Sequence, residues 1–358
     1  MFGIYIHIPF CRTICPYCDF VRERAPGAVP ETYVGALCRE IAQFEGPQAA
    51  SSVFLGGGTP SLLRGESLAR ILEALKRRFS LDAPEITLEA NPDDVTGALA
   101  RAWRDAGVNR VSLGVQSFDD GALRYLGRRH DARRARAACE TVAGFFENWG
   151  MDLIFGARPV EAWGDTLRAC VDLGPPHVSV YGLTYEAGTP FERRAADAVE
   201  QDESLQLYQE AEAALADYGH YEISNYAKPG FEARHNLRYW RNEEYAGFGT
   251  GAFSFVNGVR ARNHADTRAY MARPGEKSEA LRLTAREVRV ETVIQHFRLR
   301  DGLPKQYYRD RFGGEARDDF GPPLDELIQR GLVREFEGAY RPTPEGFYLN
   351  NEIGLALV

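Results

Sequence analysis

The sequence predicts an α/β protein, built as an incomplete (βα)6 barrel and followed by a small C-terminal domain. Short apolar segments alternate with amphipathic helical segments six times, as expected for parallel strands that are buried on both faces. Glycine and polar residues recur where the apolar segments end, and ligands of parallel barrels bind at the C-terminal ends of the strands. Six units favour an open barrel over a closed eight-stranded one. A doubly wound open sheet is the alternative fold.

The barrel is expected within residues 1–220. Its strands are predicted over residues 3–8, 52–55, 85–89, 110–115, 151–155 and 177–183. Its helices are predicted over residues 31–44, 66–79, 96–106, 132–145, 165–173 and 203–218. The segment 66–79 shows the helical pattern most clearly, because its apolar residues recur three or four positions apart and mark one buried face.

Residues 221–280 are interpreted as a linking segment and residues 281–358 as a separate C-terminal domain. Helices predicted over 286–297 and 322–331 precede a hairpin with its turn at Gly338, an order that resembles a winged helix. The domain also carries a group of acidic side chains, namely Asp325, Glu326, Glu335 and Glu337. We therefore expect a lid or docking domain over the barrel mouth rather than a DNA-binding domain.

Composition narrows the class of protein. The chain has 358 residues, of which 44% are hydrophobic, and a net charge of −8, which argues against general nucleic-acid binding. No apolar run approaches the roughly 20 residues of a membrane span, and no signal peptide precedes the first strand. We expect a cytoplasmic protein without a transmembrane segment, and contact with a membrane surface is left open. Cys38, Cys139 and Cys170 are expected to be buried, reduced thiols.

Cys11, Cys15 and Cys18 lie in one short loop directly after the first predicted strand. Thiolates this close together repel one another unless a soft cation neutralises them. Iron–sulfur clusters usually have four cysteine ligands, so three cysteines predict a [4Fe-4S] cluster with one iron open to ligand exchange. A Cys3His zinc site that uses His7 or a distant ligand is the alternative.

The spacing of these cysteines, C-x3-C-x2-C, resembles the radical S-adenosylmethionine (SAM) superfamily, in which the open iron chelates the amino and carboxylate groups of SAM. Residues at the next two strand ends suit such a ligand. The three glycines of 56–58 lack Cβ atoms, so the backbone can approach the ligand, although they also suit a tight turn. Glu89 can accept hydrogen bonds from a ribose hydroxyl or an ammonium, or it can stabilise a helix N-terminus.

Three more polar residues lie in or after later predicted strands. Gln116 supplies an uncharged donor and acceptor at the end of the fourth strand. Arg128 is suited to pair with the carboxylate of SAM. Asp152 lies within an apolar strand, where a carboxylate needs a partner or a ligand hydroxyl because an unpaired buried charge is costly.

Five motifs resemble, in the same order, the oxygen-independent coproporphyrinogen III oxidase-like group of radical SAM proteins. These motifs occupy residues 5–11, 56–61, 89–92, 114–118 and 152–156. The resemblance implies a radical SAM barrel with a HemN-type C-terminal domain. It implies SAM contacts at Tyr5, Tyr17, Gly57, Gly58, Thr59, Glu89, Gln116, Arg128 and Asp152, and further contacts at Leu183 and Phe253.

Within that group, two features are similar to the heme chaperone HemW family. The true oxidase has a further cysteine two residues after the third cluster ligand, where this chain has Phe20. Residues 235–240 resemble the HNxxYW motif, which implies heme contacts at His235, Tyr239 and Trp240. An imidazole is a common heme ligand and aromatic rings suit a porphyrin face. The same three residues also fit ordinary packing, with the imidazole hydrogen bonded inside the protein.

Two segments differ from the family pattern. Relatives read G-L-P-G-Q after the fifth strand, where this chain has Ala157-Arg158-Pro159-Val160 after Gly156. Relatives read G-A-H at residues 251–253, where this chain has Phe253. Both segments lie near the expected substrate mouth, so we expect that substrate or heme handling has diverged.

Three functions are weighed. The first is a heme-binding chaperone that carries a SAM-coordinated [4Fe-4S] cluster and delivers heme to an unidentified acceptor protein. The second is a radical SAM enzyme that acts on a porphyrin, as an oxygen-independent coproporphyrinogen III dehydrogenase, or on another organic substrate. The third is a zinc-stabilised binding protein. Phe20 favours the chaperone and predicts that coproporphyrinogen dehydrogenase activity is absent.

Overall fold

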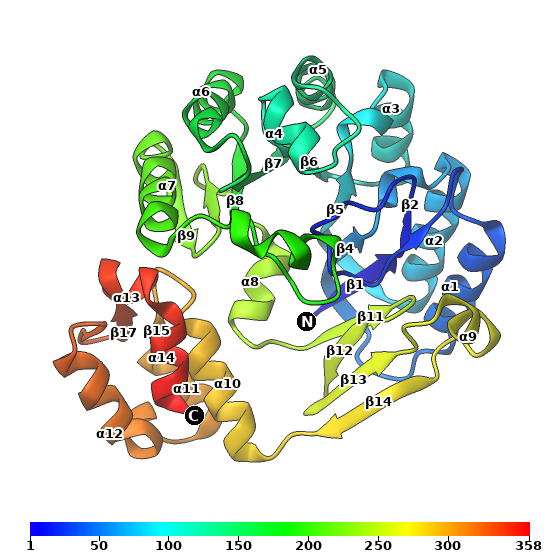
Figure 1. The fold of residues 1–358 in the computed structure, drawn as a ribbon. Helices are drawn as coiled ribbons and strands as arrows, with labels where there is room; N and C mark the ends of the chain where they lie inside the picture. Colours follow the sequence, from blue (N-terminus) through cyan, green and yellow to red (C-terminus); the bar gives the residue numbers. More distant parts are fainter.

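The central feature of the computed structural model, which describes all 358 residues, is a 12-stranded sheet with the order β14-β13-β12-β11-β1-β4-β5-β6-β7-β8-β10-β9. Six neighbouring parallel strands form its middle: β1 (Phe2–Ile8), β4 (Ala49–Gly57), β5 (Ser80–Ala90), β6 (Arg110–Gln116), β7 (Asn148–Phe155) and β8 (His177–Gly182). They curve into part of a barrel (Figure 1). The predicted incomplete (βα)6 barrel is therefore confirmed.

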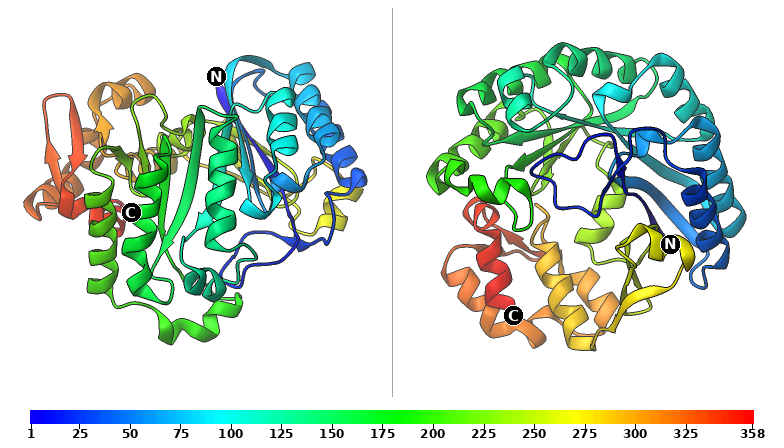
Figure 2. Two further views of the ribbon diagram at one scale, coloured as in Figure 1. Left: turned by 90° about the horizontal axis from the view of Figure 1, so that it is seen from above. Right: turned by 45° about the vertical axis from the view of Figure 1, so that its right-hand side comes forward.

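Helices cover the outer face of these strands (Figures 1 and 2). They are α1 (Glu31–Gln43), α2 (Gly65–Arg78), α3 (Gly97–Ala106), α4 (Asp120–Tyr125), α5 (Ala132–Ala143), α6 (Trp163–Leu173) and α7 (Gln201–Ala214). Each of the six predicted helices is present, and α4 is an additional short one. None of the helices in the chain is both long enough and apolar enough to span a bilayer.

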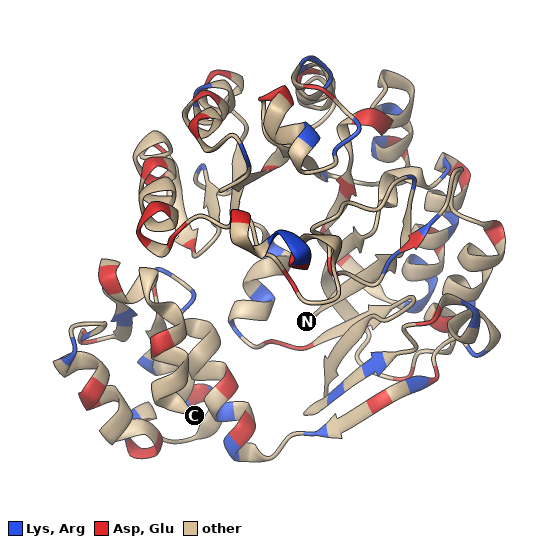
Figure 3. Cartoon of the chain, in the orientation of Figure 1, with Lys and Arg blue, Asp and Glu red and all other residues tan.

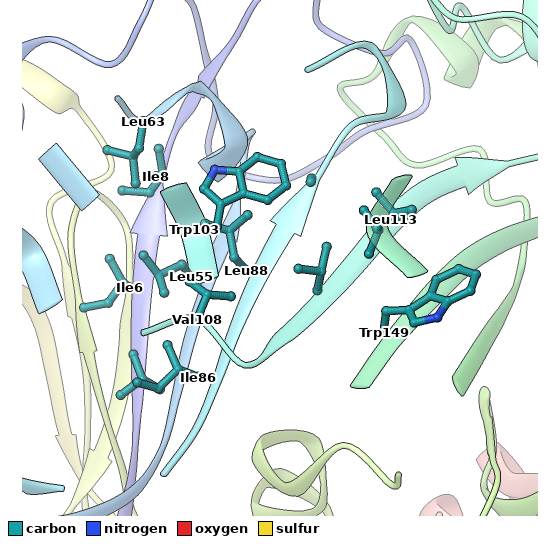
Figure 4. Close-up of a cluster of buried hydrophobic side chains, with 14 of the residues drawn as sticks. Ile6, Ile8, Leu55, Leu63, Ile86, Leu88, Trp103, Val108, Leu113 and Trp149 are labelled. Atoms are coloured by element: carbon teal, nitrogen blue, oxygen red, sulfur yellow. The ribbon is translucent and has the colours of Figure 1, made fainter. Parts of the chain in front are cut away.

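Alternate side chains of the parallel strands lie in two different environments. Ile6, Leu55 and Leu88 point towards the helices and belong to a core of 53 buried residues, part of which is shown in Figure 4. The side chains that alternate with such apolar residues along the strands, for example Glu89 in β5 and Asp152 in β7, line the inside of the barrel. The strands thus carry apolar side chains outward and polar side chains inward, because their side chains alternate between the two faces.

The segment expected to link the two domains instead extends the sheet. β11 (Tyr245–Phe248) pairs in parallel with β1, and β12 (Phe253–Val256), β13 (Val259–Asn263) and β14 (Lys277–Arg282) follow as antiparallel strands. The same region contains β9 (Gly219–Glu222), β10 (Asn225–Ala227), α8 (Arg234–Trp240) and α9 (Thr267–Ala272). These strands are short and several are polar, so their sequence lacks the apolar runs that marked the barrel strands.

The C-terminal residues form a small domain with its own core of 13 buried residues. Its elements are α10 (Ala285–His296), β15 (Leu303–Pro304), α11 (Lys305–Phe312), α12 (Ala316–Gln329), β16 (Val333–Glu335), β17 (Ala339–Pro342), α13 (Pro344–Tyr348) and α14 (Asn350–Leu357). The expected helices and hairpin are present, and β15 completes a three-stranded sheet. Lys and Arg residues are interspersed with Asp and Glu residues along the ribbon of this domain (Figure 3).

Candidate cofactor site

The three loop cysteines lie together at the C-terminal end of β1. The loop begins at β2 (Phe10–Cys11) and returns at β3 (Glu23–Arg24), which pairs with β2 and so closes it. Cys11 is buried, Cys15 and Cys18 are half-buried, and none of them forms a disulfide. All three border one cavity of about 460 Å³.

The three thiols form a set of soft ligands, which suits an iron–sulfur cluster. No group of three or more His, Cys, Asp and Glu side chains is arranged around a single ion position in this structure. Iron–sulfur clusters usually take four thiolates. The donor set of three thiols beside an open cavity therefore fits a [4Fe-4S] cluster with one iron left for another ligand.

The cavity also brings together residues that are far apart in the sequence. Nine of the predicted SAM contacts line it: Tyr17, Gly57, Gly58, Thr59, Glu89, Gln116, Arg128, Asp152 and Leu183. They come from the C-terminal ends of successive strands, as the barrel architecture requires. Tyr5 does not line this cavity, and its hydroxyl bonds to Nδ1 of His7 at 2.9 Å.

The glycine turn after β4 needs its glycines. Gly57 has a φ of 105°, which side chains rarely adopt, and its amide donates a hydrogen bond to Oε2 of Glu89 at 3.0 Å. A Cβ atom on Gly58 would lie 2.7 Å from the carbonyl oxygen of Ile8, at the start of the cysteine loop. The turn therefore packs directly against that loop, and no larger residue fits at Gly58.

Two carboxyl groups lie inside the barrel at the base of the cavity. Burial, followed by the nearby Asp152, raises the pKa of Glu89 to about 8. Burial also raises the pKa of Asp152, which accepts a hydrogen bond from Oγ of Ser112 at 3.1 Å. Because neither carboxyl is paired with a cation, both are available to the hydroxyl or ammonium groups of a ligand.

Gln116 and Arg128 occupy the side of the cavity formed by β6. Gln116 is a non-glycine residue with a φ of 69°, at a register irregularity between β6 and β7. Nη1 of Arg128 donates to Sγ of Cys15 at 3.3 Å, and Nη2 donates to the carbonyl of Gly114 at 2.8 Å. Arg128 thus contacts the cysteine loop as well as the space expected for SAM.

A short helical segment after β8 packs against the cysteine loop. In this segment, η4 (Pro190–Asp197), the amide of Phe191 donates to the carbonyl of Pro16 at 3.1 Å. The buried Phe191 ring packs against the rings of Tyr17 and Tyr185. Sequence analysis did not identify this support, because a single phenylalanine in a loop carries no distinguishing pattern.

The residues implied as heme contacts lie elsewhere. His235 is in α8, at the opposite end of the strands from the cysteine loop, and is 1% exposed. Its Nδ1 bonds to Oγ of Ser52 at 3.0 Å and its Nε2 bonds to the hydroxyl of Tyr239 at 2.9 Å. Burial, followed by the charge of Arg238, lowers the pKa of His235 to about 3. In this conformation both imidazole nitrogens are hydrogen bonded inside the protein, and heme contact at His235 remains a prediction.

The other two expected contacts are also engaged within the protein. The ring of Tyr239 packs edge-on against His235, and the guanidinium of Arg298 lies 4.5 Å from the centre of the Trp240 ring. Neither residue lines the cavity. Phe253, implied as a SAM contact, is 45% exposed in β12, where Arg262 stacks on its ring, and it does not line the cavity either.

Comparison with known proteins agrees with this geometry. Residues 5–194 match the radical SAM superfamily, and residues 283–349 match the HemN C-terminal domain. The chain is 36% identical to the heme chaperone HemW of Escherichia coli (strain K12) over 99% of this chain and 98% of that protein. It is 33% identical to the heme chaperone HemW of Bacillus subtilis (strain 168), with the same coverage of both chains.

The chain belongs to the HemW heme chaperone family. The chain is also similar to a mouse protein named radical S-adenosyl methionine domain-containing protein 1, mitochondrial, with 38% identity over 99% of this chain and 87% of that protein. Among solved structures, coproporphyrinogen III oxidase (HemN) from Escherichia coli matches with a TM-score of 0.86 over 99% of this chain and 89% of that chain. At 23% identity this likeness concerns the fold.

Proposed function

We propose that this HemW family member is a heme-binding chaperone that holds a [4Fe-4S] cluster and SAM and delivers heme to an acceptor protein. The observation that carries the proposal is the cavity in which three free thiols meet nine polar, glycine or apolar residues suited to SAM. We place the protein in the cytosol, where its six free cysteines stay reduced.

Within the site, Cys11, Cys15 and Cys18 would hold the cluster and leave one iron open to SAM. The Gly57–Gly58 turn brings backbone close to the ligand. Glu89, Gln116, Arg128 and Asp152 provide the polar contacts around it. This division of roles rests on the family resemblance and on the positions of these side chains around one cavity.

The proposal that this protein binds heme is supported by the names of its relatives, which are heme chaperones. The acceptor protein is unidentified. We expect no coproporphyrinogen dehydrogenase activity, because the residue two positions after Cys18 is the exposed Phe20 rather than a cysteine. A porphyrin-oxidising radical SAM enzyme is the competing function, and the assay below distinguishes the two.

The test uses anaerobically reconstituted full-length protein. Wild type should bind about four irons, bind SAM, and give a shifted Soret band that saturates near one equivalent of heme. A variant combining Cys11→Ala, Cys15→Ala and Cys18→Ala should lose the iron and the SAM binding, whereas the control Cys38→Ala should keep both. Formation of protoporphyrinogen from coproporphyrinogen III with SAM and a reductant would replace the chaperone by the oxidase. Absence of both heme binding and oxidation would contradict the proposal.

The variant His235→Ala separates two roles for that residue. If His235 ligates heme, the Soret band changes. If it is a packing residue, the free energy of unfolding falls while the band of the folded fraction is unchanged. Because both ring nitrogens are bonded inside the protein, we expect the second result.

A further inference from the structure

A chain of three side chains connects two of the cluster thiols behind the cavity. Nη2 of Arg128 donates to Oδ1 of Asn91 at 2.5 Å, and Nδ2 of Asn91 donates to Oγ1 of Thr59 at 3.1 Å. The hydroxyl of Thr59 donates to Sγ of Cys11 at 3.5 Å, while Nη1 of Arg128 donates to Sγ of Cys15 at 3.3 Å. Asn91 is therefore the link between the donors of two different thiols.

The direction of each hydrogen bond in this chain follows from the groups involved. Arginine can only donate, so the amide of Asn91 must turn its oxygen towards Arg128. Its nitrogen then faces Thr59 and occupies an acceptor position of that hydroxyl. The hydrogen of Thr59 is left for the sulfur of Cys11, which has no other donor of this kind. A hydroxyl that could otherwise rotate is thus held in one orientation.

Further hydrogen bonds from neighbouring groups fix the side chains that link the two thiols. The backbone amide of Asn91 donates to Oγ of Ser61 at 3.3 Å, and Ser61 in turn donates to Asp94 at 2.7 Å. Thr59 is 4% exposed, which limits the contact of its hydroxyl with water. Arg128 is fixed by the carbonyl of Gly114 as well as by Asn91. Both donors are therefore anchored by protein groups other than the thiols.

We infer that Asn91 is a positioning residue that acts through Thr59 and Arg128 to raise the reduction potential of the cluster. Reduction adds negative charge to the cluster and its thiolates, and hydrogen bonds to the sulfurs stabilise that charge. Arg128 adds a positive charge at Cys15. The inference rests on the proposed cluster but concerns its potential rather than its presence.

The experiment measures the midpoint potential of the reconstituted cluster by a redox titration monitored by electron paramagnetic resonance. In Asn91→Ala, Thr59 is free to rotate and Arg128 loses one anchor. The ratio of reduced to oxidised cluster at a fixed applied potential should fall about tenfold, which is about 59 mV for a one-electron couple. Thr59→Val should also lower the potential, and Thr59→Ser should restore most of it.

The matched control is Asn109→Ala. Asn109 is an amide at the opposite end of the same strands, where it bonds to the backbone of Ile86 and Pro84. It should leave the midpoint potential unchanged. The double variant Asn91→Ala with Thr59→Val should shift the potential by less than the sum of the two single shifts, since part of the effect of Asn91 passes through Thr59.

Iron and sulfide content is measured first, on every variant. A wild-type protein without a cluster would overturn the proposed function itself. Full iron content with an unchanged potential in Asn91→Ala would overturn only the present inference. If Asn91→Ala fails to hold iron, Thr59→Val decides, because it removes one donor and leaves Asn91 and Arg128 in place. An unchanged potential in that variant would also overturn the inference.

Discussion

At the scale of single residues, the site combines groups whose charge state depends on burial. Glu89 lies at the base of the cavity and contacts the Gly57 amide. Its carboxyl is partly removed from water inside the barrel and gains no paired cation, so the protonated form is favoured. A ligand that brings hydroxyl or ammonium groups would compensate for this cost. In the ligand-free protein, the ionised carboxyl of Glu89 therefore lowers the stability of the fold.

The variant Glu89→Gln tests this cost through its pH dependence. The pKa of Glu89 is raised from 4.5 to about 8 in the folded protein. The stability that the carboxyl contributes is thus fully present below its unfolded pKa and is lost as the pH rises through the folded value. Glutamine does not titrate. The free energy of unfolding of the variant, minus that of wild type, should therefore increase from about pH 5 to about pH 8, by up to about 1.4 kcal/mol per pH unit.

Urea unfolding of the cluster-free proteins at several pH values measures this difference. The control is Glu287→Gln, since Glu287 is exposed in the first turn of α10 and hydrogen bonds from Thr284 lower its pKa. The difference in the free energy of unfolding between Glu287→Gln and wild type should be constant from about pH 5 to about pH 8. A constant difference for Glu89→Gln as well would show that this carboxyl is ionised at pH 7.

At the scale of elements, the site depends on segments that hold the cysteine loop from two sides. The glycine turn after β4 contacts the start of the loop. The segment η4 contacts its middle through the Phe191 amide, and the Phe191 ring packs against Tyr17 and Tyr125. Residues 12–24 of the loop are all half-buried or exposed, so these neighbours supply its rigidity.

The variant Phe191→Ala should loosen the cysteine loop. Phe191 is 1% exposed, and a buried Phe→Ala change costs about 3–5 kcal/mol. Because the ring packs on the loop, much of that loss should appear as local opening, and tryptic cleavage within residues 12–24 should accelerate about tenfold or more. Phe336→Ala, at a position that is 47% exposed in the C-terminal domain, is the control. Equal cleavage rates in the two variants would refute a supporting role for η4.

At the scale of the whole molecule, the barrel and the C-terminal domain have separate cores joined by a largely polar interface. The hydroxyl of Tyr307 donates to the carbonyl of Arg241 at 2.7 Å, and Arg260 pairs with Glu291 at 2.7 Å. The ring of Phe347 packs edge-on against His220. Interfaces of this kind allow two domains to unfold with different free energies.

The variant Leu324→Ala tests this separation. Leu324 is fully buried in the smaller core, where a Leu→Ala change typically costs about 2–5 kcal/mol. Hydrogen exchange should accelerate in α10 and α12 and stay unchanged in β4 and β5. Leu72→Ala, in the barrel core, should give the opposite pattern. Uniform acceleration in both variants would mean that the chain unfolds as one unit.

Sequence alone determined the barrel and most of the cofactor site. Apolar strands and amphipathic helices repeat regularly, and residues that follow parallel strands must meet at one edge of the sheet. This is why the sequence alone predicts that Cys11, Glu89 and Asp152 share one site, and all three line the same cavity. The strands β11–β14 were not predicted, because short and partly polar strands depend on their neighbours rather than on local pattern.

Only the tertiary structure decided how the individual side chains are used. The motif at residues 235–240 is compatible with heme contact and with packing, and only the tertiary structure shows that His235 is hydrogen bonded to Ser52 and Tyr239 in this conformation. The motif at residues 89–92 gives no sign of the role of Asn91, whereas the structure shows its amide bridging Thr59 and Arg128. Sequence specifies which groups share a strand end, whereas burial and hydrogen-bond direction depend on atoms that the fold brings from distant segments.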